Sequence, residues 1–357
     1  MARLMRFAMR FPPIARSEHS PRMAPKGRTS MTGLTGIGRR LALLVAATLL
    51  GSAAAQAQAN YPDKPIRMVI AFAAGGPTDV VGRLLAPRLS EILGQQVIVE
   101  NKPGATGNIG TAMVAAASPD GYTILFSAST MAMAPALYGD KLGYDPVNGL
   151  QAIAYVASVP LILLTPMDGA KSTQELVSML RKDPGKYSYA SSGNGGMIHL
   201  ASYLFAVRAG GDALHVPYRG SAPGMVDMIA GRHGFQIDTL QSSKGFIDGN
   251  KVRVIGVAAD KRLKQLPDVP TVKEVTGFDY SINTWYAAYA PAKTPRAIVD
   301  KLNAAFNTAL KHPDMVKKAD ELAIELIEST PEQAKKFYDD QMAFWDPIIK
   351  KSGAKPE

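Results

Sequence analysis

Residues 66–92 read IRMVIAFAAGGPTDVVGRLLAPRLSEI and contain three elements in succession. The apolar run Ile66–Phe72 predicts a strand, and the glycine pair that follows predicts a turn. Beyond the turn, apolar residues recur at three- and four-residue spacing until Gly94, which predicts an amphipathic helix that ends there. A strand that leads directly into a helix is the repeating unit of α/β folds.

The same order recurs along the rest of the chain. We expect strands at 97–99, 122–126, 187–190, 215–218, 234–240 and 252–258, and helices at 109–117, 197–207, 223–230 and from 296 onward. Thr330-Pro331-Glu332-Gln333 is typical of a capping box at the start of a final helix. This alternation predicts α/β layers around a mainly parallel sheet.

Two segments are expected to carry the chain between two lobes. Residues 154–164 form an uncapped apolar run that is too long for most single strands, and 285–290 form an aromatic-rich strand followed by a proline-rich segment. A chain that leaves one α/β lobe and later returns to it would place 60–163 plus 285–357 in lobe 1 and 164–284 in lobe 2.

The first 59 residues predict a secretory signal peptide. Arg39-Arg40 precede an apolar run at 41–50, and a segment of small residues follows, which is the order of such a leader. The apolar run is shorter than the ~20 residues that a membrane span needs. We expect cleavage after Ala57 or Ala59; the competing interpretation is a retained amphipathic anchor. The long basic region before the run favours Met31 as the true start codon.

Charge and cysteine usage exclude several functions. The formal net charge is +10, but residues 60–357 carry 31 basic and 29 acidic side chains, a net of +2 with no basic cluster. A nucleic-acid partner, which needs a basic stripe, is therefore not expected. The chain has no cysteine, which removes disulfides, thiolate nucleophiles and cysteine-based zinc sites.

Four turns that follow expected strands are rich in Gly, Ser, Thr and Asn. They lie at 73–79, 127–130, 191–196 and 219–222. A helix start offers unpaired N–H groups, each terminus stabilising an anion by ~0.3–1 kcal/mol. Any one such turn is a routine capped helix start, but the set in two lobes favours a cleft that binds a small carboxylate.

Three further residues have open interpretations. The Asp79 carboxylate would repel an anion at its own helix start, so it is expected to orient the turn or hold water. His199 is expected either to donate into the cleft or to pack and cap. Asp238 is expected either to meet a ligand hydroxyl or amine, or to begin a turn.

Signatures of catalysis are mostly absent from the sequence. There is no Gly-x-Ser-x-Gly elbow, no His-Glu-x-x-His and no phosphate-binding Gly-x-x-x-x-Gly-Lys motif. The histidines after residue 60 have spacings that indicate no metal site, and they are His199, His215, His233 and His312. We expect no enzyme, metal or cofactor; a hydrolytic enzyme whose residues assemble in space is the minor alternative.

Seven motifs together resemble one known family. They are Tyr61–Arg67, Gly75–Asp79, Asn101–Gly110, Asp120–Thr123, Ser191–Gly195, Val216–Ser221 and Leu266–Thr271. In this order they are similar to the periplasmic solute-binding proteins of tripartite tricarboxylate transporters, the Bug family. The resemblance spans essentially all of residues 60–357.

The resemblance implies a type II periplasmic-binding-protein fold, with two α/β lobes joined by crossover strands and a ligand cleft between them. It implies a monomer in the periplasm that closes by a hinge over a small carboxylate and is recognised by membrane permease subunits. The implied ligand-binding positions are Gly75, Gly76, Thr78, Asp79, Ser127, Ser129, Thr130, Ser191, Ser192, Gly193, Asn194, Gly195, His199 and Asp238.

The chain departs from the family pattern at three places. Ala73-Ala74 stands where Pro-Pro or Pro-Ala is usual, Thr106 stands where Gly is common, and 231–235 differs from the usual run just before Asp238. The sequence leaves open whether the solute is a dicarboxylate, a tricarboxylate, an aromatic acid, an amino acid or a nicotinate-like compound. A ligand sensor that feeds a signalling receptor is the alternative to transport.

Overall fold

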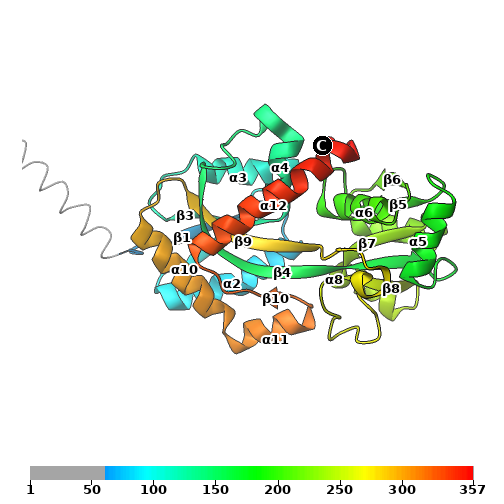
Figure 1. The fold of residues 1–357 in the computed structure, drawn as a ribbon. Coiled ribbons are helices and arrows are strands. Elements are labelled where there is room, and N and C mark those ends of the chain that lie inside the picture. Colours follow the sequence, from blue (N-terminus) through cyan, green and yellow to red (C-terminus); the bar gives the residue numbers. More distant parts are fainter. Residues whose placement is uncertain (1–60, 357) are drawn as a thin grey trace, which may run out of the picture. The chain divides into compact units, whose positions relative to one another are not determined.

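The computed structural model describes residues 61–356, so the expected signal peptide and both cleavage positions lie outside the described residues. Strands and helices alternate along the described chain (Figure 1). The strands are β1 (Ile66–Ile70), β2 (Val97–Asn101), β3 (Thr123–Ala128), β4 (Leu150–Pro166), β5 (Ser188–Ser191), β6 (Leu214–Pro217), β7 (Phe235–Thr239), β8 (Val252–Ala258), β9 (Asn283–Pro291) and β10 (Glu325–Leu326).

The helices confirm the main helical predictions and add others. They are α2 (Pro77–Leu93), α3 (Asn108–Ala115), α4 (Thr130–Tyr138), α5 (Thr173–Lys182), α6 (Met197–Arg208), α7 (Ser221–Ile229), α8 (Leu240–Asp248), α9 (Val272–Thr276), α10 (Arg296–Leu310), α11 (Pro313–Glu321) and α12 (Pro331–Ser352). The predicted capping box at Thr330 and Gln333 is present at the start of α12. Helices α4, α5, α8 and α9 were not predicted, whereas α10, α11 and α12 lie in the tail that was predicted to be helical.

The sheet is mixed, so the prediction of a mainly parallel sheet is wrong for its centre. The strand order is β2-β1-β3-β9-β4-β7-β5-β6, with β8 and β10 also paired to β4. Pairing is parallel within β2-β1-β3 and within β7-β5-β6, as predicted. Strand β4 pairs antiparallel with β7, β8, β9 and β10, and β9 pairs antiparallel with β3. The chain leaves one lobe along β4 and returns along β9, so these two strands run in opposite directions.

Strand β4 belongs to both lobes. The apolar run that was judged too long for most single strands is one strand of 17 residues. Its first part, Leu150–Pro160, pairs with β9, and Leu161–Leu164 pair with β7. Figure 1 shows β4 and β9 running side by side through the middle of the described chain.

Buried apolar side chains form separate clusters at the two ends of β4. One contains Ile70, Phe126 and Phe306 around β1 and β3, and another contains Tyr189, Phe205 and Phe235 around β5 and β7. Helix α12 serves both ends of β4: Ala334 and Tyr338 join a cluster with β3 and β9, whereas Trp345 and Ile349 join the cluster with β5 and β7. The residue limits of the two lobes stay a prediction, since α12 and α4 are shared.

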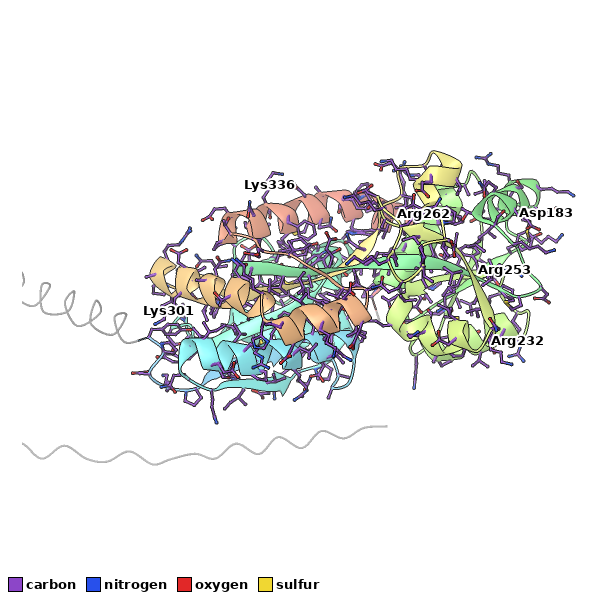
Figure 2. All side chains as sticks on the ribbon, turned by 90° about the horizontal axis from the view of Figure 1, so that it is seen from below. Asp183, Arg232, Arg253, Arg262, Lys301 and Lys336 are labelled. Carbon is purple, nitrogen blue, oxygen red and sulfur yellow. The ribbon has the colours of Figure 1, made fainter. Side chains whose placement is uncertain are left out.

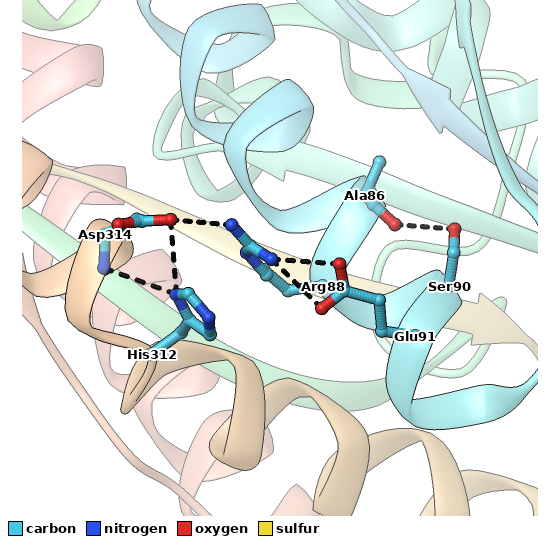
Figure 3. A network of polar contacts seen from close by, with 6 residues as sticks. All are labelled: Ala86, Arg88, Ser90, Glu91, His312 and Asp314. Carbon is cyan, nitrogen blue, oxygen red and sulfur yellow. Dashed lines mark hydrogen bonds and ion pairs between the residues drawn. The ribbon is translucent and has the colours of Figure 1, made fainter.

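Helix α2, which begins at the first glycine turn, is fastened to α11 by a polar network (Figure 3). Arg88 donates to Glu91 at 2.9 Å on its own helix and to Asp314 at 2.7 Å on α11. His312 caps α11 by accepting from the Asp314 N–H at 3.2 Å. Each exposed pair contributes little alone, and together they link α2 to the start of α11.

Charged side chains are spread over the surface of both lobes. Figure 2 places Lys301 and Lys336 near α10 and α12, and Arg232, Arg253 and Asp183 at the other end of the described chain. Among residues 61–356, no helix has the length and hydropathy needed to cross a membrane.

Candidate functional site

The carboxyl ends of the parallel strands in the two lobes face each other. Ala128, the last residue of β3, pairs with Tyr286 of β9, and Tyr286 pairs with Ala157 of β4. Thr239 ends β7, which runs opposite to β4, and pairs with Leu161. The two edges are therefore four residues apart along β4, about 13 Å at ~3.3 Å per residue. Turns that follow these strands come from both sides to one region.

The first turn, Gly75–Asp79, leaves two donors free. Gly76 is the extended N-cap of α2, and Pro77 occupies the first helical position and has no N–H. The Gly76 N–H bonds to the Ala73 carbonyl at 3.3 Å. Within the described chain no hydrogen bond reaches the N–H groups of Thr78 and Asp79. These two groups can bind an oxyanion.

The Asp79 carboxylate orients this turn from within. It accepts from the Gly75 N–H at 2.8 Å, from Arg83 Nε at 2.9 Å and from Asn101 Nδ2 at 2.8 Å. Burial alone would raise the pKa of Asp79, but the hydrogen bonds from Arg83, Gly75 and Asn101 outweigh it and the pKa lies below its usual value. Of the two roles expected for Asp79, these contacts match that of orienting the turn.

The turn after β3 begins later than predicted. Ser127 and Ala128 belong to β3, and helix α4 starts directly at Thr130. Ser129 Oγ lies 2.9 Å from Thr284 Oγ1 at the start of β9, and Thr130 Oγ1 donates to the Thr106 carbonyl at 3.1 Å. Ser127 Oγ is buried and has no partner in the described chain. A buried hydroxyl of this kind is satisfied by water or by a ligand.

A fifth turn, after β2, lies at the same edge and was missed as a site element. It spans Gly104–Asn108, and the hydrogen bond from Thr130 ties it to the start of α4. Thr106 has φ 55°, a left-handed conformation that glycine adopts without strain, which explains why glycine is common there. Asn108 Nδ2 is buried and has no partner among residues 61–356. The glycine content and the Asn108 amide were the available sequence signals.

In the second lobe, the turn Ser191–Gly195 is held by its own polar groups. Ser191 Oγ donates to the Gly193 carbonyl at 2.9 Å and lies 2.6 Å from His215 Nε2. The exposed hydroxyl of Ser192 makes no hydrogen bond within the described chain. Gly196 caps α6, whose first N–H groups, at Met197 and Ile198, have no partner in the described chain either.

His199 packs and caps rather than standing free. Its Nδ1 accepts from the Gly195 N–H at 3.0 Å, and its ring stacks on His215 at 3.6 Å between centroids. Burial, with a smaller effect of His215, lowers the pKa of His199 to about 3, and burial lowers that of His215 to about 4. Both rings are neutral near pH 7. They and Asn194 border a cavity of about 420 Å³ that also contacts Tyr203 and Asp212.

Asp238 begins a turn, one of its two expected roles. It is fully buried, and its oxygens accept from Gln236 Nε2 at 2.8 Å, the Thr239 N–H at 2.7 Å and Ser242 Oγ at 2.6 Å. The Ser221 hydroxyl at the start of α7 also bonds to it. Burial raises the pKa of Asp238 despite these four donors. The carboxylate thus joins the starts of α7 and α8.

The assembled groups are mainly hydrogen-bond donors at helix starts. Ser191 and His215 are in contact, but the Ser191 hydroxyl donates its proton to the Gly193 carbonyl, so His215 donates to Ser191 and is not its base. The hydroxyls of Thr78 and Ser192 make no hydrogen bond within the described chain. Asp79, His199 and Asp238 each accept a hydrogen bond from a backbone N–H. Within residues 61–356 no cluster of three or more His, Asp or Glu side chains could hold a metal ion.

Comparison with known proteins shows the family of this chain. Residues 81–354 match the model of the tripartite tricarboxylate transporter family receptor. The chain is 37% identical over 320 residues to a protein from the tcbD-tcbE intergenic region of Pseudomonas sp. (strain P51), covering 88% of this chain and 95% of that relative.

Three solved structures share the fold. They are the periplasmic binding protein BugD (35% identity, TM-score 0.71, 83% and 99% of the two chains), an R. palustris protein with adipate (31%, 0.74, 84% and 100%) and MatC from Rhodopseudomonas palustris with bound malate (27%, 0.70, 81% and 100%). These relatives are solute-binding proteins with two lobes, not enzymes. The chain belongs to the tripartite tricarboxylate transporter receptor family of periplasmic solute-binding proteins.

Proposed function

We propose that this protein binds a small carboxylate between the facing turns of its two lobes and closes on it by a hinge. The observation that carries the proposal is the set of free N–H groups at the starts of α2 and α6, which follow β1 and β5, one parallel strand from each of the two facing edges. Donors supplied by both lobes suit a short solute with a carboxylate at one or both ends.

Binding by helix starts needs no lysine or arginine. Each start stabilises an anion by ~0.3–1 kcal/mol when exposed and by up to ~2 kcal/mol when partly buried. Closure expels water and strengthens these hydrogen bonds. Ligand contacts to the second lobe then favour the closed state over the open one.

The ligand class is proposed as a short dicarboxylate. Adipate and malate were found with two relatives that are 31% and 27% identical to this chain. The predicted positions Thr78 and Ser192 supply one hydroxyl from each lobe, in addition to the backbone donors. Tricarboxylates, aromatic acids, amino acids and nicotinate-like acids complete the test panel.

Export and delivery of the ligand to a permease would follow in the cell. The leader would be cleaved after Ala57 or Ala59, and the monomeric mature chain would deliver its ligand in the periplasm to permease subunits. N-terminal sequencing of the exported protein tests the cleavage. Adjacent genes for membrane proteins with many spans would support delivery to a permease over sensing by a receptor.

Native mass spectrometry followed by thermal shift tests the binding function. We expect a co-purified acid, or a melting temperature that rises with malate or adipate concentration. The double variant Thr78→Ala plus Ser192→Ala should weaken binding at least about tenfold, the loss of two hydrogen bonds, with the melting temperature of the free protein unchanged.

Ser178→Ala is the matched control, because this exposed serine on α5 bonds only to the Gln174 carbonyl of its own helix. It should bind like the wild type. Unchanged affinity in the double variant would remove Thr78 and Ser192 from the site, and no response to any acid would overturn carboxylate binding.

A further inference from the structure

A second polar network in the lobe of β5–β7 lies behind the turn at 219–222. Tyr218 Oη donates to Asp227 Oδ2 at 2.6 Å and lies 2.6 Å from His233 Nε2. His233 Nδ1 lies 2.9 Å from Ser188 Oγ at the start of β5. Arg232, labelled in Figure 2, donates to Asp227 Oδ1 at 2.6 Å. His233 is 6% exposed, so its partners are these protein groups.

Counting protons fixes the tautomer of His233. The Tyr218 hydroxyl has one proton and donates it to Asp227, because an ionised carboxylate can only accept. This hydrogen bond and the nearby Arg232 hold the pKa of Asp227 below its usual value. Tyr218 Oη can therefore only accept from His233, so Nε2 must bear the proton. Burial lowers the pKa of His233, so the ring is neutral near pH 7 and Nδ1 is the acceptor for Ser188, whose hydroxyl also reaches the Arg232 carbonyl at 3.1 Å.

Tyr218 connects this network to the proposed site. Its N–H bonds to the Ser191 carbonyl at 3.0 Å, and two residues later the Gly220 N–H bonds to the Ser192 carbonyl at 3.3 Å. Its ring passes beside Gly224 of α7, where an added Cβ would lie 3.1 Å from the ring. The position of the Tyr218 ring thus sets how the turn 219–222 meets the turn 191–196.

We propose that His233 is a positioning residue: it holds the Tyr218 hydroxyl and through it the turn Arg219–Ala222 against Ser192. The groups that face the imidazole are Tyr218 from the end of β6, Asp227 from α7, Arg232 from its own loop and the uncharged Ser188 from β5. The effect on ligand affinity rests on the proposed function, whereas the effect on the turn does not.

The first test needs no ligand. Nitrogen-15 NMR of the imidazoles should show His233 in the Nε2–H form near pH 7. Hydrogen exchange at 219–222 should become about tenfold faster in His233→Leu, as expected from losing about one hydrogen bond. His233→Gln, which keeps a donor and an acceptor, should restore slow exchange, and His312→Gln on α11 controls for removing a histidine.

A double-mutant cycle tests whether His233 acts through Tyr218. Tyr218→Phe, which also removes the hydrogen bond to Asp227, should accelerate exchange at least as much as His233→Leu. Adding His233→Leu to Tyr218→Phe should change exchange little, because the hydrogen bond between the two side chains is already absent. If His233→Leu does not fold, Tyr218→Phe and the tautomer decide the question. Unchanged exchange in Tyr218→Phe, additive effects, or an Nδ1–H tautomer would each overturn the proposal.

The affinity measurement uses malate and adipate as probes. If either binds the wild type, His233→Leu should weaken it about five- to tenfold and His233→Gln less than about twofold. Full affinity in His233→Leu would overturn the link to the site. If neither probe binds the wild type, the proposed carboxylate function fails separately, and the exchange data still decide whether His233 positions the turn.

Discussion

The turns that begin α2 and α6 have nearly the same backbone but are held by different chemistry. Gly76 (φ −75°, ψ 167°) and Gly196 (φ −77°, ψ 169°) are the two N-caps. Each follows a left-handed glycine, Gly75 at φ 80° and Gly195 at φ 71°. In both, the side chain four residues after the left-handed glycine accepts from that glycine's N–H.

The accepting side chain is Asp79 in one lobe and His199 in the other. Asp79 is an ion paired with Arg83, whereas His199 is a neutral ring stacked on His215. The glycine N–H in each turn therefore needs an acceptor side chain, but that acceptor need not be charged. The Arg83 guanidinium offsets the charge of Asp79, so neither turn presents a bare negative group to a carboxylate.

The largest expected difference between the two turns is in how their contributions to stability change as the pH is lowered. The pKa of His199 falls from 6.5 to about 3 on folding, so the unfolded chain binds the proton first and stability is lost as pH drops below about 6.5. At pH 5 the loss for His199 is about 2 kcal/mol relative to pH 7, and His215 adds in the same direction. Asp79, whose pKa is lowered, keeps its contribution until the pH falls below about 4.

Urea unfolding at pH 7 and pH 5 measures this difference. His199→Gln should reduce the pH dependence by about one proton, and His312→Gln, at the N-cap of α11, is the control for removing a histidine. Equal pH dependence in His199→Gln and the wild type would show that the ring is not held neutral.

Replacing the two acceptors sharpens the comparison further. Both oxygens of Asp79 accept hydrogen bonds, so in Asp79→Asn the new side-chain NH2 group would face an N–H donor. This variant should lose about 2 kcal/mol of stability. His199→Gln retains an acceptor for the Gly195 N–H and should cost about 1 kcal/mol or less at pH 7. Denaturant midpoints at constant slope report both values; the reverse order would contradict the roles assigned here.

The smallest effect concerns the two left-handed glycines. Alanine at either position costs about 1–2 kcal/mol for the backbone conformation. A Cβ at Gly75 has open space, whereas one at Gly195 would lie 3.0 Å from the side chain of Leu137 on α4. Gly195→Ala should therefore be less stable than Gly75→Ala by up to about 1 kcal/mol, and the added Leu137→Ala should remove that difference. Equal melting temperatures of Gly195→Ala and Gly75→Ala would show that Leu137 moves aside without a measurable loss of stability.

Local sequence patterns predicted what depends on neighbouring residues. The glycine pairs, the proline after Gly76 and the capping box at Thr330 all signal helix starts, and these starts were correctly placed. Helix α4 was missed because TMAMAPALY is apolar almost throughout, so it lacks the periodicity that marks an exposed helix. It is apolar because it packs between clusters from both ends of β4.

Features that join distant residues were beyond the sequence. The partners of Asp79 include Arg83, one helical turn away and readable, and Asn101, which only the β1–β2 pairing brings near. The stacking of His199 on His215 requires β6 to lie beside β5. The reversed direction of β4 and β9 depends on how the chain returns to its first lobe, which apolar runs do not encode.

The shared strand β4 has a consequence for the order of folding. Its first part and β3 both pair with β9, a strand more than 110 residues farther along the chain. Contacts of such separation slow folding, because a long loop must close before they form. The sheet of the first lobe therefore stays incomplete on the ribosome until β9 has been synthesised, and the chain remains without its central strand pair for most of its translation.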